Sequence, residues 1–201
     1  MNSNYLYEYS ILFEIVLSVG YKLDYSLPAL ERAISYSRFF QNIESDDKTL
    51  PPIINDRHLI SEIFPDCEID LDNVPTYNQC LWASEAYLRI QGESHLTFET
   101  IFLYLPIGKM YDLFSVYHEM DFSQIVQYFM SLTEKKTVFA LLLDKFKYSI
   151  KDISETTNIP YATLFSLKQG HRDMKKTSVE VVNKLANIFR VRLETLAELK
   201  L

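Results

Sequence analysis

Glycine is scarce in this chain: four glycines occur among 201 residues, beside seven prolines and a single tryptophan. Barrels and sandwiches need frequent turns rich in such residues, so the composition does not favour them. Leucine, isoleucine, glutamate and lysine are plentiful instead, and 48% of the residues are hydrophobic. Composition and length therefore predict an all-α protein with a substantial core.

Cysteine and long apolar runs are also scarce. Cys67 and Cys80 lack CxxC spacing, so we expect two simple core or surface thiols rather than a paired metal site or a disulfide. The apolar stretch 11–19 is interrupted by Glu14 and Ser18 and follows no basic segment. The sequence thus predicts neither a signal peptide nor a membrane span, and we expect a cytoplasmic protein.

Familiar catalytic and metal-binding motifs are missing. We find no glycine-rich phosphate loop, no nucleophile elbow and no clear pair of catalytic carboxylates. Four acidic residues alternate as in a calcium loop, namely Asp66, Glu68, Asp70 and Asp72. Leu71 and Tyr77, however, stand where that loop requires glycine and a bidentate glutamate. His118, Glu119 and Asp121 lack the spacing of a zinc-binding HExxH motif. We therefore expect no enzyme, no cofactor and no metal.

Charge is distributed unevenly along the chain. Residues 1–134 contain 7 Lys and Arg against 20 Asp and Glu, a net −13, whereas residues 135–201 contain 13 against 7, a net +6. Phosphate binding responds to a local patch, because salt screens exposed charges beyond about 10 Å. We predict an acidic, aromatic-rich helical module over 1–134 and a basic domain over 135–201.

The basic segment begins with two helix patterns. From Thr137, the sequence TVFALLLDKFK places apolar residues on one helical face, namely Val138, Leu141, Leu142 and Phe146. Ser149 and Asp152 have the spacing of a capping box, which predicts a helix over 150–157 that buries Ile150 or Ile153.

A short turn and a further helix follow. Asn158 tolerates the left-handed conformation of a tight turn, and Pro160 suits the first turn of a helix. The pattern predicts a helix over 160–168 with Leu164 and Leu167 inward and Gly170 as its C-terminal stop.

Two more helices complete the segment. Thr177 and Glu180 have capping-box spacing before SVEVVNKLANIFR, which predicts a helix with one buried face formed by Val182, Leu185, Ala186 and Phe189. The closing LETLAELKL predicts a short helix that buries Leu196 and Leu199. Five short helices with a three-residue turn in the middle indicate a helix-turn-helix domain.

This pattern resembles a known family, the Cro and phage-repressor type helix-turn-helix domains, also called the xenobiotic response element (XRE) family. The resemblance covers 135–201 and includes the helix SVEVVNKLANIF, the closing VRLETLAEL and the spacing of Ile153, Ile159, Leu164, Leu167 and Gly170. It implies a cytoplasmic bacterial or phage repressor that binds double-stranded DNA as a homodimer at two half-sites.

The resemblance also implies roles for individual residues. It makes 160–168 the recognition helix in the major groove. The positions facing base edges are Tyr161, Ala162, Phe165 and Ser166. The positions facing the DNA backbone are Lys151, Thr163, Lys168, Gln169, His171, Arg172, Lys175 and Lys176.

The predicted recognition helix departs from the family in its polarity. No Arg, Gln or Asn stands early in it, so the bidentate readings of guanine and adenine are missing. We expect Tyr161 and Ala162 to contact thymine methyl groups and specificity to be modest or to come partly from DNA shape. A face with Tyr161 and Phe165 also suits docking of another protein, and this alternative stays open.

The acidic module gives a coarser prediction. We expect helices over 10–23, 27–43, 59–64 and 76–91, the last ended by Gly92, and three more over 96–132 that break at Pro106 and near 119–121. Nine aromatic residues are spaced densely enough to fill a core: Phe98, Phe102, Tyr104, Tyr111, Phe114, Tyr117, Phe122, Tyr128 and Phe129.

The function of this module stays open between alternatives. Its first tyrosines pack on its own core or on a second subunit, and they are Tyr5, Tyr7, Tyr9, Tyr21 and Tyr25. In a regulator, the module dimerises or senses a partner or ligand. In an antitoxin or inhibitor, its negative charge attracts a basic protein target, while the helix-turn-helix represses its own operon.

Overall fold

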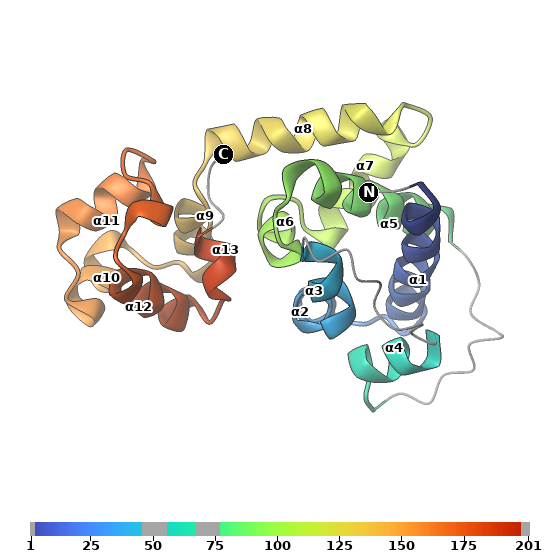
Figure 1. Cartoon of the computed structure of the whole chain (residues 1–201), viewed down its shortest axis with the longest axis horizontal. Helices are drawn as coiled ribbons and strands as arrows, with labels where there is room; N and C mark the ends of the chain where they lie inside the picture. Colours follow the sequence, from blue (N-terminus) through green and yellow to red (C-terminus); the bar gives the residue numbers. More distant parts are fainter. Residues whose placement is uncertain (1–2, 46–55, 67–76, 198–201) are drawn as a thin grey trace. The chain divides into compact units, whose positions relative to one another are not determined.

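Every regular element that the structure describes is helical (Figure 1). The computed structural model describes residues 3–45, 56–66 and 77–197, and no strand occurs in these ranges. The predicted all-α class is therefore confirmed. None of the helices in these ranges has the length and apolar character needed to cross a membrane.

The chain divides into two compact units, Met1–Tyr128 and Phe129–Leu201, called here the first and the second unit. The division lies inside a helix, α8, which spans Phe122–Lys135. The boundary predicted after Glu134 lies near the end of the same helix. The structure places the units individually, and each is described by itself below.

The first unit contains seven complete helices in its described part and the start of α8. They are α1 (Ser3–Lys22), α2 (Leu27–Tyr36), α3 (Arg38–Glu44), α4 (Asp56–Ile63), α5 (Asn78–Ser94), α6 (Phe98–Tyr104) and α7 (Ile107–Tyr117). The longest two, α1 and α5, pack side by side and form the centre of the unit.

Aromatic rings fill the core between these helices. The fully buried Phe13 of α1 lies with its ring centroid 4.6 Å from that of Phe40, 5.6 Å from Phe98 and 5.9 Å from Tyr87. The Tyr87 hydroxyl donates a 2.9 Å hydrogen bond to the carbonyl of Leu105, so its polar end is satisfied inside the core. The Phe13 ring of α1 thus contacts rings from α3, α5 and α6.

Three glutamates cap the beginnings of helices that lie far from them in sequence. Glu62 accepts a hydrogen bond from the backbone N–H of Arg38 at 2.8 Å, at the start of α3. Glu44 accepts one from Phe98 at 2.6 Å, at the start of α6. The buried Glu31 accepts one from Ile107 at 2.8 Å, at the start of α7. The first N–H groups of a helix have no partner within it, so these carboxylates stabilise the helix starts.

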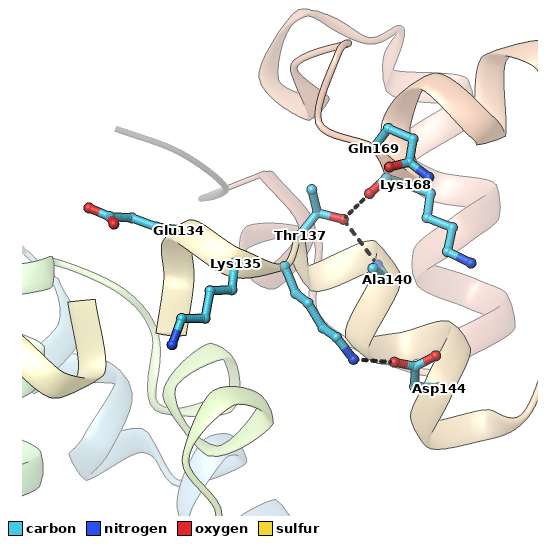
Figure 2. A pocket seen from close by; sticks show the side chains of 8 residues that line it. Glu134, Lys135, Thr137, Ala140, Asp144, Lys168 and Gln169 are labelled. Carbon is cyan, nitrogen blue, oxygen red and sulfur yellow. Dashed lines mark hydrogen bonds and ion pairs between the residues drawn. The ribbon is translucent and has the colours of Figure 1, made fainter. Parts of the chain in front are cut away.

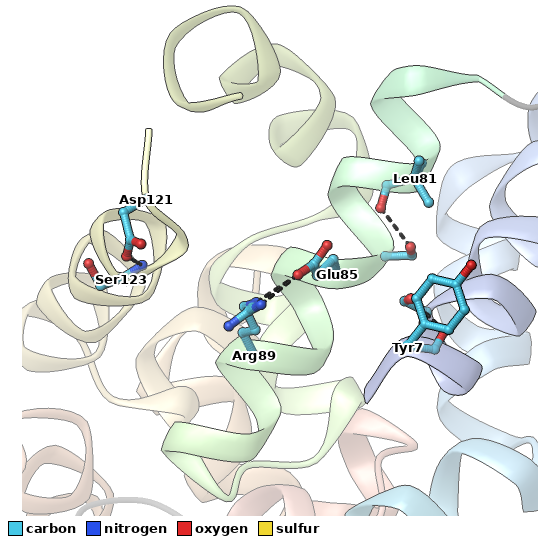
Figure 3. A network of polar contacts seen from close by, with 8 residues as sticks. Tyr7, Leu81, Glu85, Arg89, Asp121 and Ser123 are labelled. Atoms are coloured by element: carbon cyan, nitrogen blue, oxygen red, sulfur yellow. Dashed lines mark hydrogen bonds and ion pairs between the residues drawn. The ribbon is translucent and has the colours of Figure 1, made fainter. Parts of the chain in front are cut away.

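A cation–π contact and an aromatic stack join α5 to the start of α8. Arg89 binds Glu85 on its own helix through two nitrogens, at 2.6 and 3.0 Å (Figure 3). Its guanidinium also lies 4.8 Å from the centroid of the Phe122 ring, which stacks against Trp82. Asp121 caps α8 by accepting a 2.8 Å hydrogen bond from the N–H of Ser123 (Figure 3).

The Cys80 thiol belongs to the core. It is fully buried, its Sγ lies 3.5 Å from the hydroxyl of Tyr111, and burial raises the pKa of the thiol. A buried thiol with a raised pKa is little ionised at neutral pH and therefore unreactive. Cys67 lies outside the described residues, as do Glu68, Asp70, Leu71 and Asp72 of the alternating acidic segment.

Several predicted helix boundaries in the first unit are wrong. Helix α1 begins at Ser3, seven residues before the predicted start, and α4 begins at Asp56, three residues before it. The segment 27–43 forms two helices, because Ser37 between α2 and α3 adopts an extended conformation with ψ of 134°. Helix α5 continues past Gly92 to Ser94 and ends at His95, whose φ is 54°. The predicted breaks at Pro106 and near 119–121 are confirmed.

The predicted aromatic core is partly confirmed. Phe98, Phe102 and Phe129 are buried, whereas the other six residues of that set are half-buried. Among the N-terminal tyrosines, Tyr9 packs edge-on against Phe39 and Tyr25 against Phe64, so both contact their own unit. Tyr7 and Tyr21 are 69% and 49% exposed. The Tyr5 side chain lies outside the described residues.

The second unit contains the end of α8, five further α-helices and one short 3-10 helix in its described part. They are α9 (Val138–Phe146), α10 (Ile150–Thr157), α11 (Tyr161–Lys168), η2 (Met174–Lys176), α12 (Val179–Phe189) and α13 (Leu193–Ala197). The four residues predicted to form the buried face of α12 are all buried, and so is Leu196 of α13. Leu199 lies outside the described residues.

Two details of the second unit differ from the prediction. Val138 and Leu142 of α9 are buried, but Leu141 is only half-buried and Phe146 is 38% exposed, with its ring against Phe189. Helix α12 starts after Ser178 without a side-chain cap. The predicted capping box is absent because the N-cap is Ser178 rather than Thr177, which puts Glu180 at the second helical position instead of the third. The Thr177 hydroxyl donates to the carbonyl of Asp173 at 3.0 Å.

Candidate nucleic-acid interface

The candidate interface begins with a firmly capped helix, α10. The Ser149 hydroxyl accepts a 3.1 Å hydrogen bond from the N–H of Asp152, whose carboxylate accepts one from the N–H of Ser149 at 2.9 Å. This is the predicted capping box. Both Ile150 and Ile153 are buried, where the sequence pattern predicted one or the other.

We expect the capping box to make the stability of the second unit sensitive to acid. The hydrogen bond with Ser149 is the main cause that lowers the pKa of Asp152 below its ordinary value of 3.8. A lowered pKa in the folded state stabilises the fold above pH 3.8 and ceases to do so as pH falls through the folded value. Asp152→Asn should therefore lower the melting temperature at pH 7, and its difference from the parent chain should shrink below pH 3.8.

Ser149→Ala provides the matched variant for this measurement. Loss of an N-cap hydroxyl costs about 1 kcal/mol, so the melting temperature should fall at pH 7 as well. Equal melting temperatures for the parent chain and both variants at pH 7 would contradict a stabilising role for the box.

The turn between α10 and α11 is held by side-chain hydroxyls. Asn158 ends α10 in the left-handed conformation, with φ of 57°. The Ser154 hydroxyl donates to the carbonyl of Ile159 at 2.7 Å, and the Thr157 hydroxyl accepts from the N–H of Ile159 at 3.2 Å. The buried Ile159 is thereby fixed on both sides, which sets the direction in which α11 leaves the turn. Pro160 is the N-cap residue, so α11 begins at Tyr161, one residue after the predicted start.

Helix α11 has apolar residues on its outer as well as its inner side. Leu164 and Leu167 are buried, as predicted. Tyr161, Ala162 and Phe165 are exposed, and Thr163 and Ser166 are half-buried. The Tyr161 and Phe165 rings, called here the aromatic pair, stack with centroids 6.3 Å apart and planes inclined by 16°. The four residues expected to face base edges therefore all have some solvent access.

The loop after α11 carries most of the residues expected at the DNA backbone. Gly170 has a φ of 71°, a conformation that favours glycine, and it turns the chain after the helix. The backbone N–H groups of His171 and Arg172 then donate to the Ser166 carbonyl at 3.0 and 3.2 Å. The side chains of Gln169, His171, Arg172, Lys175 and Lys176 are exposed, whereas Lys168 is half-buried.

The charges of this loop are available for an external partner. Lys151 on α10 approaches Glu155 at 3.8 Å, a weak exposed pair. Within the described residues, no ion pair engages Lys168, Arg172, Lys175 or Lys176. Asp173, the one carboxylate among them, caps η2 by accepting a hydrogen bond from the N–H of Lys175 at 2.9 Å. The surface beside the end of α11 is therefore cationic.

A hollow of about 330 Å³ lies beside the C-terminal end of α11 (Figure 2). Its cationic lining residues are Lys135, Lys136 and Lys168, and its acidic ones are Glu134 and Asp144. Lys136 pairs with Asp144 at 2.8 Å, which reduces the free positive charge there. Thr137 donates to the carbonyl of Lys168 at 3.0 Å and accepts from the N–H of Ala140 at 3.1 Å, so it fastens the end of α11 to the start of α9.

Three fixing residues were missed from the sequence: Thr137, Ser154 and Thr157. Ser154 and Thr157 lie in the last turn of α10, where a hydroxyl is a weak signal because such residues also bond back to their own helix. Thr157 does so as well, donating to the carbonyl of Ile153 at 2.6 Å. Thr137 is the N-cap of α9, and its second hydrogen bond, to the distant Lys168 carbonyl, has no signal in the sequence. These residues position α11 through their hydrogen bonds.

Comparison with known proteins adds no family or relative. No protein-family model matches the chain, and the searches of curated proteins and of solved structures also found no match.

Proposed function

We propose that the protein is a DNA-binding transcriptional regulator, a repressor that inserts α11 into the major groove. The observation that carries the proposal is an outward-facing α11 whose exposed side chains are flanked by cations that form no ion pair with any residue the structure describes. The capped α10, the short turn and the resemblance to Cro and phage-repressor type domains support the same use of the second unit. A recognition helix must be held rigidly, and the hydroxyls of Ser154 and Thr157 contribute to this.

Electrostatic attraction supplies the affinity in this proposal. Lys168, Arg172, Lys175 and Lys176 lie at or after the end of α11, where cations release counterions from the phosphates. Lys151, Thr163, Gln169 and His171 complete the expected backbone contacts. Such contacts fix the position of the protein along the duplex. The bases are then contacted by Tyr161, Ala162, Phe165 and Ser166.

In this proposal the first unit either forms the dimer interface or senses a partner or ligand. A repressor that reads two half-sites needs a two-fold interface, and the tyrosines exposed on α1 suit one. Tyr7 and Tyr21 offer apolar area with a polar end. We propose a homodimer formed through the first unit in the cytoplasm of a bacterium or a phage-infected cell.

A salt series with full-length protein and random-sequence duplex tests the proposal. Affinity should fall steeply as salt rises, with a logarithmic slope of about −0.9 for each phosphate contacted. Arg172→Ala and Lys176→Ala should each weaken every sequence alike and reduce that slope by about one. Lys109→Ala, which removes an exposed cation of α7 in the first unit, is the matched control and should change neither quantity.

The opposite results are equally clear. Full-length protein that retains no duplex at low salt would exclude DNA binding. Equal weakening by Lys109→Ala and Arg172→Ala would show attraction by overall charge rather than by the loop after α11.

An antitoxin or inhibitor is the second candidate, favoured by the net charge of −13 over residues 1–134. A surface of this sign accelerates association with a basic protein, and salt weakens that association. Capture of a basic partner by full-length protein, together with retained DNA binding, distinguishes it from a simple repressor. Failure to capture such a partner leaves the simple repressor.

A further inference from the structure

The outer face of α11 offers little hydrogen bonding to a base. Of its eight residues, YATLFSLK, only Lys168 at the last position is charged, and none is Arg, Asn or Gln. Tyr161 and Phe165 are 54% and 43% exposed, and Ala162 between them is exposed too. The polar Thr163 and Ser166 are half-buried. The most accessible surface near the start of the helix is therefore aromatic and methyl carbon.

The aromatic pair forms a fixed surface. Residues four apart lie on one face of a helix, and here the two rings are nearly parallel, inclined by 16° with centroids 6.3 Å apart. Leu164 and Leu167, buried on the opposite side, prevent α11 from turning about its axis. Aromatic side chains have few rotatable bonds, so little entropy is lost when such a surface meets a ligand.

The major groove offers one apolar group that matches this surface. Each base pair presents donors and acceptors at its edge, and thymine adds a C5-methyl group. We propose that the aromatic pair and Ala162 read the C5-methyl groups of pyrimidines, so that the chain selects sites by thymine, or by 5-methylcytosine, rather than by bidentate hydrogen bonds. This inference rests on the proposed function, because it presumes that α11 enters the groove.

A substitution in the DNA that removes only the methyl group tests this inference. Duplexes bound by full-length protein are selected from a random pool, and the enriched sequence is synthesised with thymine or with deoxyuridine. Burying a methyl group favours binding about fourfold, so the deoxyuridine duplex should bind about fourfold more weakly for each methyl contacted and about fifteenfold for two. At the same positions, 5-methylcytosine should bind about fourfold more tightly than cytosine.

Variants assign the effect to the aromatic pair. The double variant Tyr161→Ala, Phe165→Ala should lose most of the preference for the thymine duplex, because only Ala162 then remains to contact a methyl group. Tyr161→Phe should keep the preference, because it retains the ring and loses only the hydroxyl. Lys176→Ala should weaken both duplexes and leave their ratio unchanged. Because these side chains are exposed, circular dichroism should show the parent helix content in every variant.

The outcomes separate the inference from the function beneath it. Equal binding of both duplexes, with weakening by Arg172→Ala, overturns methyl reading and leaves DNA binding in place. Salt-sensitive binding without any enriched sequence likewise overturns methyl reading and leaves DNA binding in place. A ratio of the thymine to the deoxyuridine affinity that is undiminished in the double variant overturns the assignment to the aromatic pair. If the full-length protein binds no duplex, the inference and the proposed function are overturned together. The same holds if α11 proves to dock another protein instead of DNA.

Discussion

Leu164→Ala should lower the free energy of unfolding of the second unit by about 2–5 kcal/mol, the usual cost of a cavity in a well-packed core. Leu164 is fully buried on the inner side of α11, whereas Tyr161 and Phe165, which flank it in the sequence, are exposed. Truncating the Leu164 side chain removes one of the buried contacts that hold α11 against the rest of its unit. DNA affinity should fall with it, because a recognition helix that changes its angle no longer fits the groove.

Two measurements check this expectation. Amide hydrogen exchange should show lower protection throughout α9, α10 and α12, and a DNA titration should show weaker binding. Tyr161→Ala is the matched control on the same helix, since its side chain is 54% exposed. The control should change stability by less than about 0.5 kcal/mol while it alters base preference. Unchanged exchange in Leu164→Ala would contradict the packing of α11 described above.

Phe13→Ala should lower the stability of the first unit by about 3–5 kcal/mol, as is typical when a core phenylalanine is truncated. The Phe13 ring contacts Phe40, Tyr87 and Phe98, so its removal weakens contacts of α1 with three other helices at once. The surrounding rings are large and rigid, and they can close only part of the cavity. Such a loss is a large fraction of the stability of an ordinary domain.

Denaturant unfolding together with hydrogen exchange measures this effect. Exchange should accelerate in α1, α3, α5 and α6, where the four rings lie. Tyr7→Ala is the control on the same helix, because Tyr7 is 69% exposed and contributes little core area. A Phe13→Ala protein as stable as the Tyr7→Ala protein would show that the aromatic core is not what stabilises the first unit.

The second unit was the more predictable from sequence because its signals are local. Ser149 and Asp152 stand three residues apart, and Asn158 and Gly170 mark their turns by their own backbone preferences. These signals place α10 correctly and α11 within one residue. The error at the start of α12 has a local cause as well, since Thr177 and Ser178 are both suitable N-cap residues and periodicity does not reveal that the helix begins after the second of them.

The first unit was less predictable because distant residues decide its boundaries. Nothing within 27–43 marks the interruption at Ser37, where the capping carboxylate of the next helix comes from Glu62. Gly92 is a good helix stop by propensity, yet packing carries α5 two residues further. Propensity is a weak guide wherever tertiary contacts oppose it.

The sequence predicted which residues of the candidate interface are accessible, but it did not predict which hydrogen bonds hold α11 in place. The sequence named Tyr161, Ala162, Phe165 and Ser166, and the structure leaves all four at least partly accessible. Their contact with DNA stays a prediction. The sequence missed Ser154 as a fixing group, because a hydroxyl five residues from its acceptor becomes visible only once the turn is folded.

The glutamate caps of the first unit bear on the order in which the chain folds. Helices α3, α6 and α7 obtain their capping carboxylates from residues 24, 54 and 76 positions away. In the second unit, Thr137 and Ser149 cap their helices from within three residues. Short-range contacts close quickly, whereas long loops must first be brought together. The second unit therefore has the faster route to its native helices, although the ribosome synthesises it after the first unit.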